Sequence, residues 1–324
     1  QYTHNVLVPG SSPGGPTKAK INKIKKLFYK IFIKSLIFFP LMLLLVNIFN
    51  IFFPKDYRSD PYLVNGYFSK ENQKILNYVS NEKTKEILKY EDAIKKFDQL
   101  YSAHGETLKF LSEASKIYFL AKIPKGYSWK KRYTKIKFQE NWILYLIRKF
   151  EEIRVNLGFS SKYNNYYTYY LSSDYKFALK RGISICSQDV MSFANLLKRR
   201  YNIDYNIIGL GGHVVMQAKI KDKFYLSDPN MGLAFNFSID EYYNSTENQL
   251  KIKNAYTAIG QTKVIEDYNK EGNRKFKYTG PKPGISTYNP DTLTYYSNYI
   301  KWLLPLFLLF IGIYLKNKNR KFKF

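Results

Sequence analysis

The longest apolar runs of the chain lie near its two ends. Residues 35–54 are twenty consecutive uncharged residues, and a helix of that length, at about 1.5 Å per residue, crosses a hydrocarbon core of about 30 Å. Residues 302–315 form a shorter uncharged run, with aromatic residues at its start and lysines after its end. Such flanks suit the two interfaces of a bilayer. The pattern predicts two transmembrane helices, over residues 31–54 and 295–315.

Each apolar run has an alternative interpretation. The first could be a cleaved signal peptide, but the segment before it is long and no small-residue cleavage site follows it in "FFPKDY". The second could be a buried C-terminal helix, but the basic tail after it suits a membrane surface better. Membrane anchoring is therefore favoured at both ends.

The distribution of charge predicts the orientation of these helices. The chain has a net charge of +27, and its first 54 residues and last 24 residues contain seven Lys and six Lys or Arg, respectively, and no acid. Because basic flanks stay on the cytoplasmic side, both termini are expected in the cytoplasm and the central region outside it, at the inner, cytoplasmic membrane of a bacterium. Residues 1–30 are then a flexible basic leader and residues 316–324 a basic tail. A central region outside the cytoplasm excludes nucleic acid as a partner.

Between the two runs, the first hundred residues have helical periodicity. Apolar residues recur three or four apart in residues 84–101 and again in 106–124, and a third such segment covers 140–159. We expect residues 55–158 to form a helical support outside the membrane.

The periodicity changes after residue 180. Cys186 begins a segment in which Val190, Phe193 and Leu197 lie on one helical face. Next, "HVVMQAKI" and "KFYLSDPN" are two β-branched or aromatic runs that predict a hairpin. The chain is therefore expected to be an α+β protein.

Hairpin geometry makes a specific prediction for Asp228. With a two-residue turn at Lys221-Asp222 or one residue later, Asp228 lies opposite Val215 or Gln217. Both positions share a strand face with His213, so the imidazole and the carboxylate are expected on one side of the hairpin. A three-residue turn would place them on opposite faces unless a bulge intervened.

Cys186 is the only cysteine among 324 residues. A lone cysteine excludes an internal disulfide and the thiol clusters of structural zinc sites. At the start of a helix, unpaired amides and the positive end of the helix dipole favour thiolate over thiol, which suits a nucleophile. Free cysteines are also often inert core residues, so a nucleophile needs a base beside it.

His213 is the histidine best placed to be that base, since His4 lies in the leader and His104 in a turn between two helices. Asp228 would then orient the imidazole. Taken singly, a buried cysteine, a hydrogen-bonded histidine and an Asp-Pro turn are ordinary structural features. Their order and spacing favour a catalytic triad.

The segment "RGISICSQDVMSFANLLKRRYNIDYNIIGLGGHVVMQAKIKDKFYLSDPNMG" resembles the core of the transglutaminase-like superfamily, which has a papain-type cysteine fold. It shares a Gly-x-x-x-Cys segment opening a helix, a strand entered at His, and a next strand ending in Asp-Pro. The resemblance covers residues 163–235 and implies a core domain over 159–290, in which the nucleophile helix packs on an antiparallel sheet. It also implies that Cys186 is the nucleophile, His213 the general base and Asp228 the orienting residue.

The expected function is that of a membrane-tethered cysteine hydrolase or acyl transferase acting on an amide or ester bond. The alternative is a catalytically silent module of the same fold that binds peptide or polysaccharide during envelope assembly. Expected partners are the membrane and a peptide, protein or cell-surface polymer as substrate. No metal or organic cofactor is implied, and the oligomeric state stays open.

Overall fold

The computed structural model describes residues 18–80, 87–123, 135–159, 174–210, 212–269, 277–278 and 290–321. The chain divides into two compact units. One is the central part, Phe49–Ile300, and the other consists of the two chain ends, Gln1–Ile48 and Lys301–Phe324.

The unit of the chain ends contains most of two long helices, α1 (Lys18–Phe52) and α15 (Pro290–Lys321), whose remaining residues belong to the central unit. Both are long and apolar enough to cross a membrane. They contact each other: the Asn47 side-chain amide donates a 2.7 Å hydrogen bond to the Lys301 carbonyl. At Gly312 a side chain would come within 2.9 Å of Ile37, so glycine permits close packing there.

These helices extend beyond the predicted spans. The sequence led us to expect a flexible leader over residues 1–30. In the structure α1 begins at Lys18, so residues 18–30 are helical. Lysine is a good helix former, and the basic residues there continue the helix instead of ending it. α15 likewise continues through residues 316–321 of the predicted tail. Residues 1–17 and 322–324 of the leader and tail lie outside the described residues.

The central unit is α+β, as predicted. Its strands form one antiparallel sheet in the order β4-β3-β2-β1-β5. The strands are β1 (Asp204–Gly209), β2 (Val214–Ile220), β3 (Lys223–Asp228), β4 (Leu233–Ala234) and β5 (Lys277–Tyr278). The helical elements are η1 (Tyr57–Ser59), α2 (Pro61–Tyr67), α3 (Lys70–Val79), α4 (Tyr90–His104), α5 (Leu108–Leu120), α8 (Trp142–Asn156), α10 (Tyr175–Arg181), α11 (Cys186–Tyr201), α12 (Ile239–Asn244), α13 (Thr246–Ala258) and α14 (Lys263–Asn269). The three helices predicted between residues 84 and 159 are therefore present as α4, α5 and α8.

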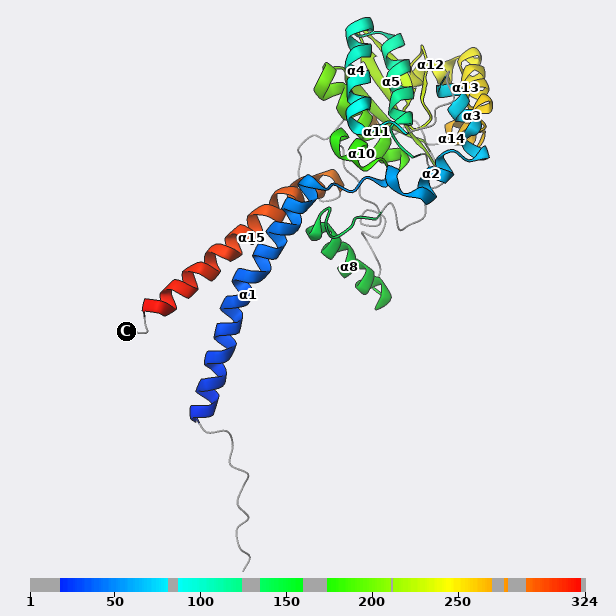
Figure 1. The fold of residues 1–324 in the computed structure, drawn as a ribbon. Helices are drawn as coiled ribbons and strands as arrows, with labels where there is room; N and C mark the ends of the chain where they lie inside the picture. Colours follow the sequence, from blue (N-terminus) through cyan, green and yellow to red (C-terminus); the bar gives the residue numbers. More distant parts are fainter. Residues whose placement is uncertain are drawn as a thin grey trace, which may run out of the picture. The chain divides into compact units, whose positions relative to one another are not determined.

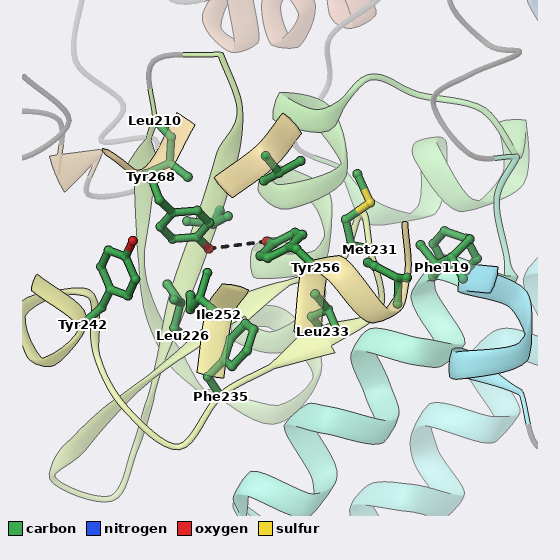
Figure 2. Close-up of a cluster of buried hydrophobic side chains, with 14 of the residues drawn as sticks. Phe119, Leu210, Leu226, Met231, Leu233, Phe235, Tyr242, Ile252, Tyr256 and Tyr268 are labelled. Carbon is green, nitrogen blue, oxygen red and sulfur yellow. Dashed lines mark hydrogen bonds between the residues drawn. The ribbon is translucent and has the colours of Figure 1, made fainter. Parts of the chain in front are cut away.

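The sheet separates two buried clusters of apolar side chains. Neighbouring strand residues point to opposite faces, so Ile207 and Met216 belong to one cluster and Ile208 and Val215 to the other. The first cluster is completed by α4, α5, α10 and α11, and the second by α3 and α12 to α14. These two groups of helices flank the sheet in Figure 1, and Figure 2 shows side chains of the second cluster. Because α4 and α5 share a core with the sheet, the expected boundary near residue 158 does not divide the central unit.

The hairpin of β2 and β3 has the predicted two-residue turn. Ile220 pairs with Lys223 across Lys221-Asp222, and Met216 pairs with Ser227. Continuing this register by one residue places Asp228 opposite Val215. Lys221 adopts a left-handed φ of 54°, which lets a sequence without glycine make this turn.

Arg58 joins three segments of the central unit that are distant in the sequence. Its guanidinium donates to the carbonyls of Leu88, Ala121 and Lys180 and pairs with Asp56. Gly182 has a φ of 70°, and a side chain there would come within 2.7 Å of Arg58. The conformation and the close approach together require glycine four residues before Cys186.

Candidate functional site

Cys186 is the first residue of α11. The preceding residue, Ile185, is extended and offers no side chain to cap the first turn of the helix. Val190, Phe193 and Leu197 are fully buried and anchor α11 against the sheet, as their spacing predicted. Cys186 itself is partly exposed, at the start of a helix that is fixed by its buried side chains.

His213 and Asp228 form a buried pair on adjacent strands. His213 lies one residue before β2, and Asp228 is the last residue of β3. Nε2 of His213 lies 2.7 Å from Oδ2 of Asp228, and neither side chain is exposed to solvent. In the sheet, Asp228 of β3 pairs with Leu233 of β4, and Leu233 belongs to the same apolar cluster as Val215. The imidazole and the carboxylate therefore share one sheet face, as the hairpin geometry predicted.

The Asp228 carboxylate accepts two further hydrogen bonds. The Tyr256 hydroxyl, from α13, donates to Oδ2 at 2.7 Å, and the Asn230 backbone N–H donates to Oδ1 at 3.1 Å. The Tyr256 hydroxyl also lies 3.4 Å from that of Tyr268, the contact drawn in Figure 2. Burial, and after it the charge of Asp228, raises the pKa of Tyr256 well above its ordinary value, so Tyr256 stays a neutral donor.

The surroundings of His213 favour its protonated form. Burial alone would lower the pKa of the imidazole, but Asp228 and, after it, Cys186 outweigh burial and raise this pKa to about 10. Nδ1, the nitrogen that does not face Asp228, is buried and makes no hydrogen bond to a described residue. The Cys186 thiol is nevertheless close enough to contribute to the raised pKa of the ring. The start of α11 and the start of β2 thus meet at one end of the sheet.

A second buried pair lies beneath the start of α11. The Lys122 ammonium pairs with the carboxylate of Asp189, which is one helical turn after Cys186. Ser184, two residues before Cys186, donates to the same carboxylate and lies 3.3 Å from the ammonium. The ammonium also lies 4.1 Å from the centre of the Tyr118 ring. Lys122 therefore contacts residues on both sides of Cys186 in the sequence.

Asp228 and Cys186 also act electrostatically on Lys122. Burial lowers the pKa of its ammonium, while the charges of Asp189, Asp228 and Cys186 oppose this effect. Burial likewise raises the pKa of Asp189 against the pull of Lys122. Each group compensates the desolvation of the other.

The structure thus brings the three sequence-predicted residues together and adds Lys122, Asp189 and Tyr256, which sequence reasoning did not identify. Asp189 follows Cys186 by three residues, so helical spacing was a usable signal for it. Lys122 and Tyr256 carry no such signal, because only the packing of α5 and α13 places them near the site. Among the described residues, no group of three or more His, Cys, Asp or Glu side chains is arranged to hold a metal ion.

Comparison with known proteins identifies no relative. No protein-family model matches the chain, and no curated protein or solved structure is significantly similar to it.

The buried His213–Asp228 pair predicts how stability depends on pH. The pKa of His213 is about 10 in the folded chain and near 6.5 in the unfolded chain. The imidazolium therefore contributes stability that is complete below about pH 6.5 and is lost as the pH rises toward 10. Chemical unfolding of the full chain in detergent micelles should show the free energy of unfolding falling across this window. His213→Gln should reduce the change of the free energy of unfolding with pH, because the other titrating groups contribute equally to both proteins. An equal pH dependence in the two proteins would contradict the raised pKa of His213.

The Lys122–Asp189 pair predicts a strong coupling between two substitutions. Lys122→Met leaves a buried carboxylate without a cation and should cost about 3–5 kcal/mol. Adding Asp189→Leu removes the unpaired charge and should restore much of this loss. Unfolding of both single variants and the double variant in micelles measures the coupling; additive losses would mean that the two charges do not stabilise each other.

Proposed function

We propose that this protein is a membrane-tethered cysteine hydrolase or acyl transferase of the transglutaminase-like type. Cys186, His213 and Asp228 are its nucleophile, acid–base and orienting residue, and its substrate is an amide or ester of a peptide, protein or cell-surface polymer. The observation that carries the proposal is the buried 2.7 Å contact between His213 and Asp228, with Cys186 at a helix start beside the imidazole.

In the proposed reaction, the Cys186 thiol transfers its proton to His213, and the resulting thiolate attacks the carbonyl carbon and forms a tetrahedral oxyanion. As this collapses, the C–N or C–O bond breaks and the His213 imidazolium protonates the leaving amine or alcohol. The product is a thioester on Cys186 and a neutral imidazole. The raised pKa of His213 suits this step, since the ring is protonated before the leaving group departs.

The thioester is then resolved by water or an amine. The neutral imidazole removes a proton from the incoming nucleophile, and the C–S bond breaks to return the sulfur of Cys186 and the imidazolium. Asp228 fixes the ring through Nε2, with Tyr256 and Asn230 holding the carboxylate.

The oxyanion needs hydrogen-bond donors near the sulfur. The Cys186 backbone N–H, at the uncapped start of α11, is one candidate. The side-chain amide of Gln188 is another, because its nitrogen is buried and makes no hydrogen bond to a described residue.

Thiol reactivity tests the proposed chemistry. Iodoacetamide should alkylate Cys186 rapidly below pH 8, and His213→Ala should slow this roughly 10-fold or more. Asp228→Asn should have a smaller effect, since it keeps both reacting groups. His104→Ala is the matched control, because His104 ends α4 and takes no part in the site.

Mass spectrometry of the alkylated full chain gives these rates. Equal rates for the unmodified chain and His213→Ala would contradict the enzyme and favour a silent binding module that keeps the same fold.

The membrane tether consists of α1 and α15, whose apolar side chains are largely exposed. With basic residues before α1's apolar run and after that of α15, both termini are placed in the cytoplasm and the central unit outside it.

Protease added outside sealed spheroplasts should therefore cut the central unit and spare epitope tags at both termini. Permeabilised cells, in which both tags are cut, provide the control. Loss of the C-terminal tag in sealed cells would show that α15 does not span the membrane.

A further inference from the structure

Helix α8 exposes a stripe of large apolar side chains. Leu146, Phe150, Ile153 and Leu157 are 50, 63, 56 and 70% exposed. At about 100° per residue these four lie within about 60° of one another, on one face of the helix. Phe159, just after the helix, is also exposed.

The opposite face of α8 is buried and mixed, since it carries the apolar Leu144 together with two charged residues. Arg148 and Glu151 are each only 7% exposed, and Nε of Arg148 and Oε2 of Glu151 make no hydrogen bond to a described residue. A helix on the surface of a water-soluble domain exposes its polar face to water, so an outward apolar stripe is unusual. Elsewhere in the described central unit, exposed large apolar side chains from residue 54 to 294 are scattered: Tyr62, Tyr78, Phe138 and Leu250. The exposed stripe is therefore a property of α8.

The start of α8 is tied to the helix that enters the proposed membrane. Asn141, the N-cap of α8, donates from its side-chain nitrogen to Ser297 Oγ at 2.8 Å and to Asn298 Oδ1 at 3.2 Å. Both partners lie in α15, and Trp302 begins the apolar run of that helix only five residues after Ser297. Five helical residues rise about 7.5 Å. The N-terminus of α8 is thus held within about two helical turns of the membrane entry point.

We propose that α8 is an interfacial helix whose exposed stripe, Leu146, Phe150, Ile153 and Leu157, lies in the lipid surface on the side of the central unit. The proposal rests on the membrane tether proposed above. Over the twelve residues from Leu146 to Leu157, the stripe is about 16 Å long.

Partly exposed cations border the stripe, Lys149 on one side and Arg154 on the other, as expected for a helix at the headgroup level. Both are paired with glutamates of the same helix, so the apolar side chains supply most of the attraction to lipid. In this position the apolar side chains of the stripe leave water, which accounts for their place on the protein surface.

Fluorescent labelling of the full chain tests this proposal. In a Cys186→Ser background, a single cysteine is introduced at Phe150 and labelled with an environment-sensitive nitrobenzoxadiazole group. Phe307→Cys, in the apolar run of α15, is the lipid reference, and Glu247→Cys, whose side chain is 76% exposed, is the water reference. The labelled chains are reconstituted in nanodiscs of phosphatidylcholine and phosphatidylglycerol, and quenching by nitroxide-bearing lipid is compared with quenching by iodide.

The label at Phe150 should emit at shorter wavelength than that at Glu247, with about two-fold or stronger quenching by nitroxide lipid than by iodide. Iodide quenching at Phe150 with lipid quenching at Phe307 would overturn the α8 proposal and leave the tether intact. Protection at Phe150 from both quenchers would also overturn it, because protein, such as a second copy of the chain, would then cover the stripe. Iodide quenching at Phe307 would refute the tether and the α8 proposal with it.

Discussion

A carboxylate buried without a positive partner is strongly destabilising, and this constraint governs the arrangement around Cys186. Asp189 and Asp228 are both buried near the start of α11. The structure compensates Asp189 with Lys122 and Asp228 with His213. Each pair joins segments that are distant in the chain, so charge compensation and the assembly of the site are one requirement.

The two pairs have different chemical consequences. Lys122 is enclosed by Asp189, Ser184 and the Tyr118 ring, so its role is to position the start of α11. His213 bonds Asp228 through one nitrogen only, which leaves Nδ1 without a hydrogen bond to a described residue. Under the proposed function this nitrogen exchanges its proton with the sulfur and the leaving group. The tyrosine of α13 and the turn after β3 hold the carboxylate, so the ring can act without losing its partner.

Three helices expose large apolar side chains on their surfaces. In α1 and α15, and along the stripe of α8, these side chains lie on the outside. In water such surfaces would be unfavourable, since the hydrophobic effect opposes them. Under the membrane tether and the α8 position proposed above, a bilayer as the surrounding solvent accounts for all three helices with one physical cause.

The sequence by itself determined the features encoded in contiguous residues. The two apolar runs, the helices α4, α5, α8 and α11, and the side-chain parity that places His213 and Asp228 on one face follow from local periods of 3.6 and 2 residues. The predicted start of α1 was wrong. The lysine-rich residues before the apolar run were taken to lie outside the helix, although lysine is a good helix former and can continue it. Tertiary structure alone decided that Lys122 compensates Asp189, that Tyr256 supports Asp228, and which face of α8 is buried. These contacts depend on how separate elements pack, and no local pattern records which buried charge will find which partner.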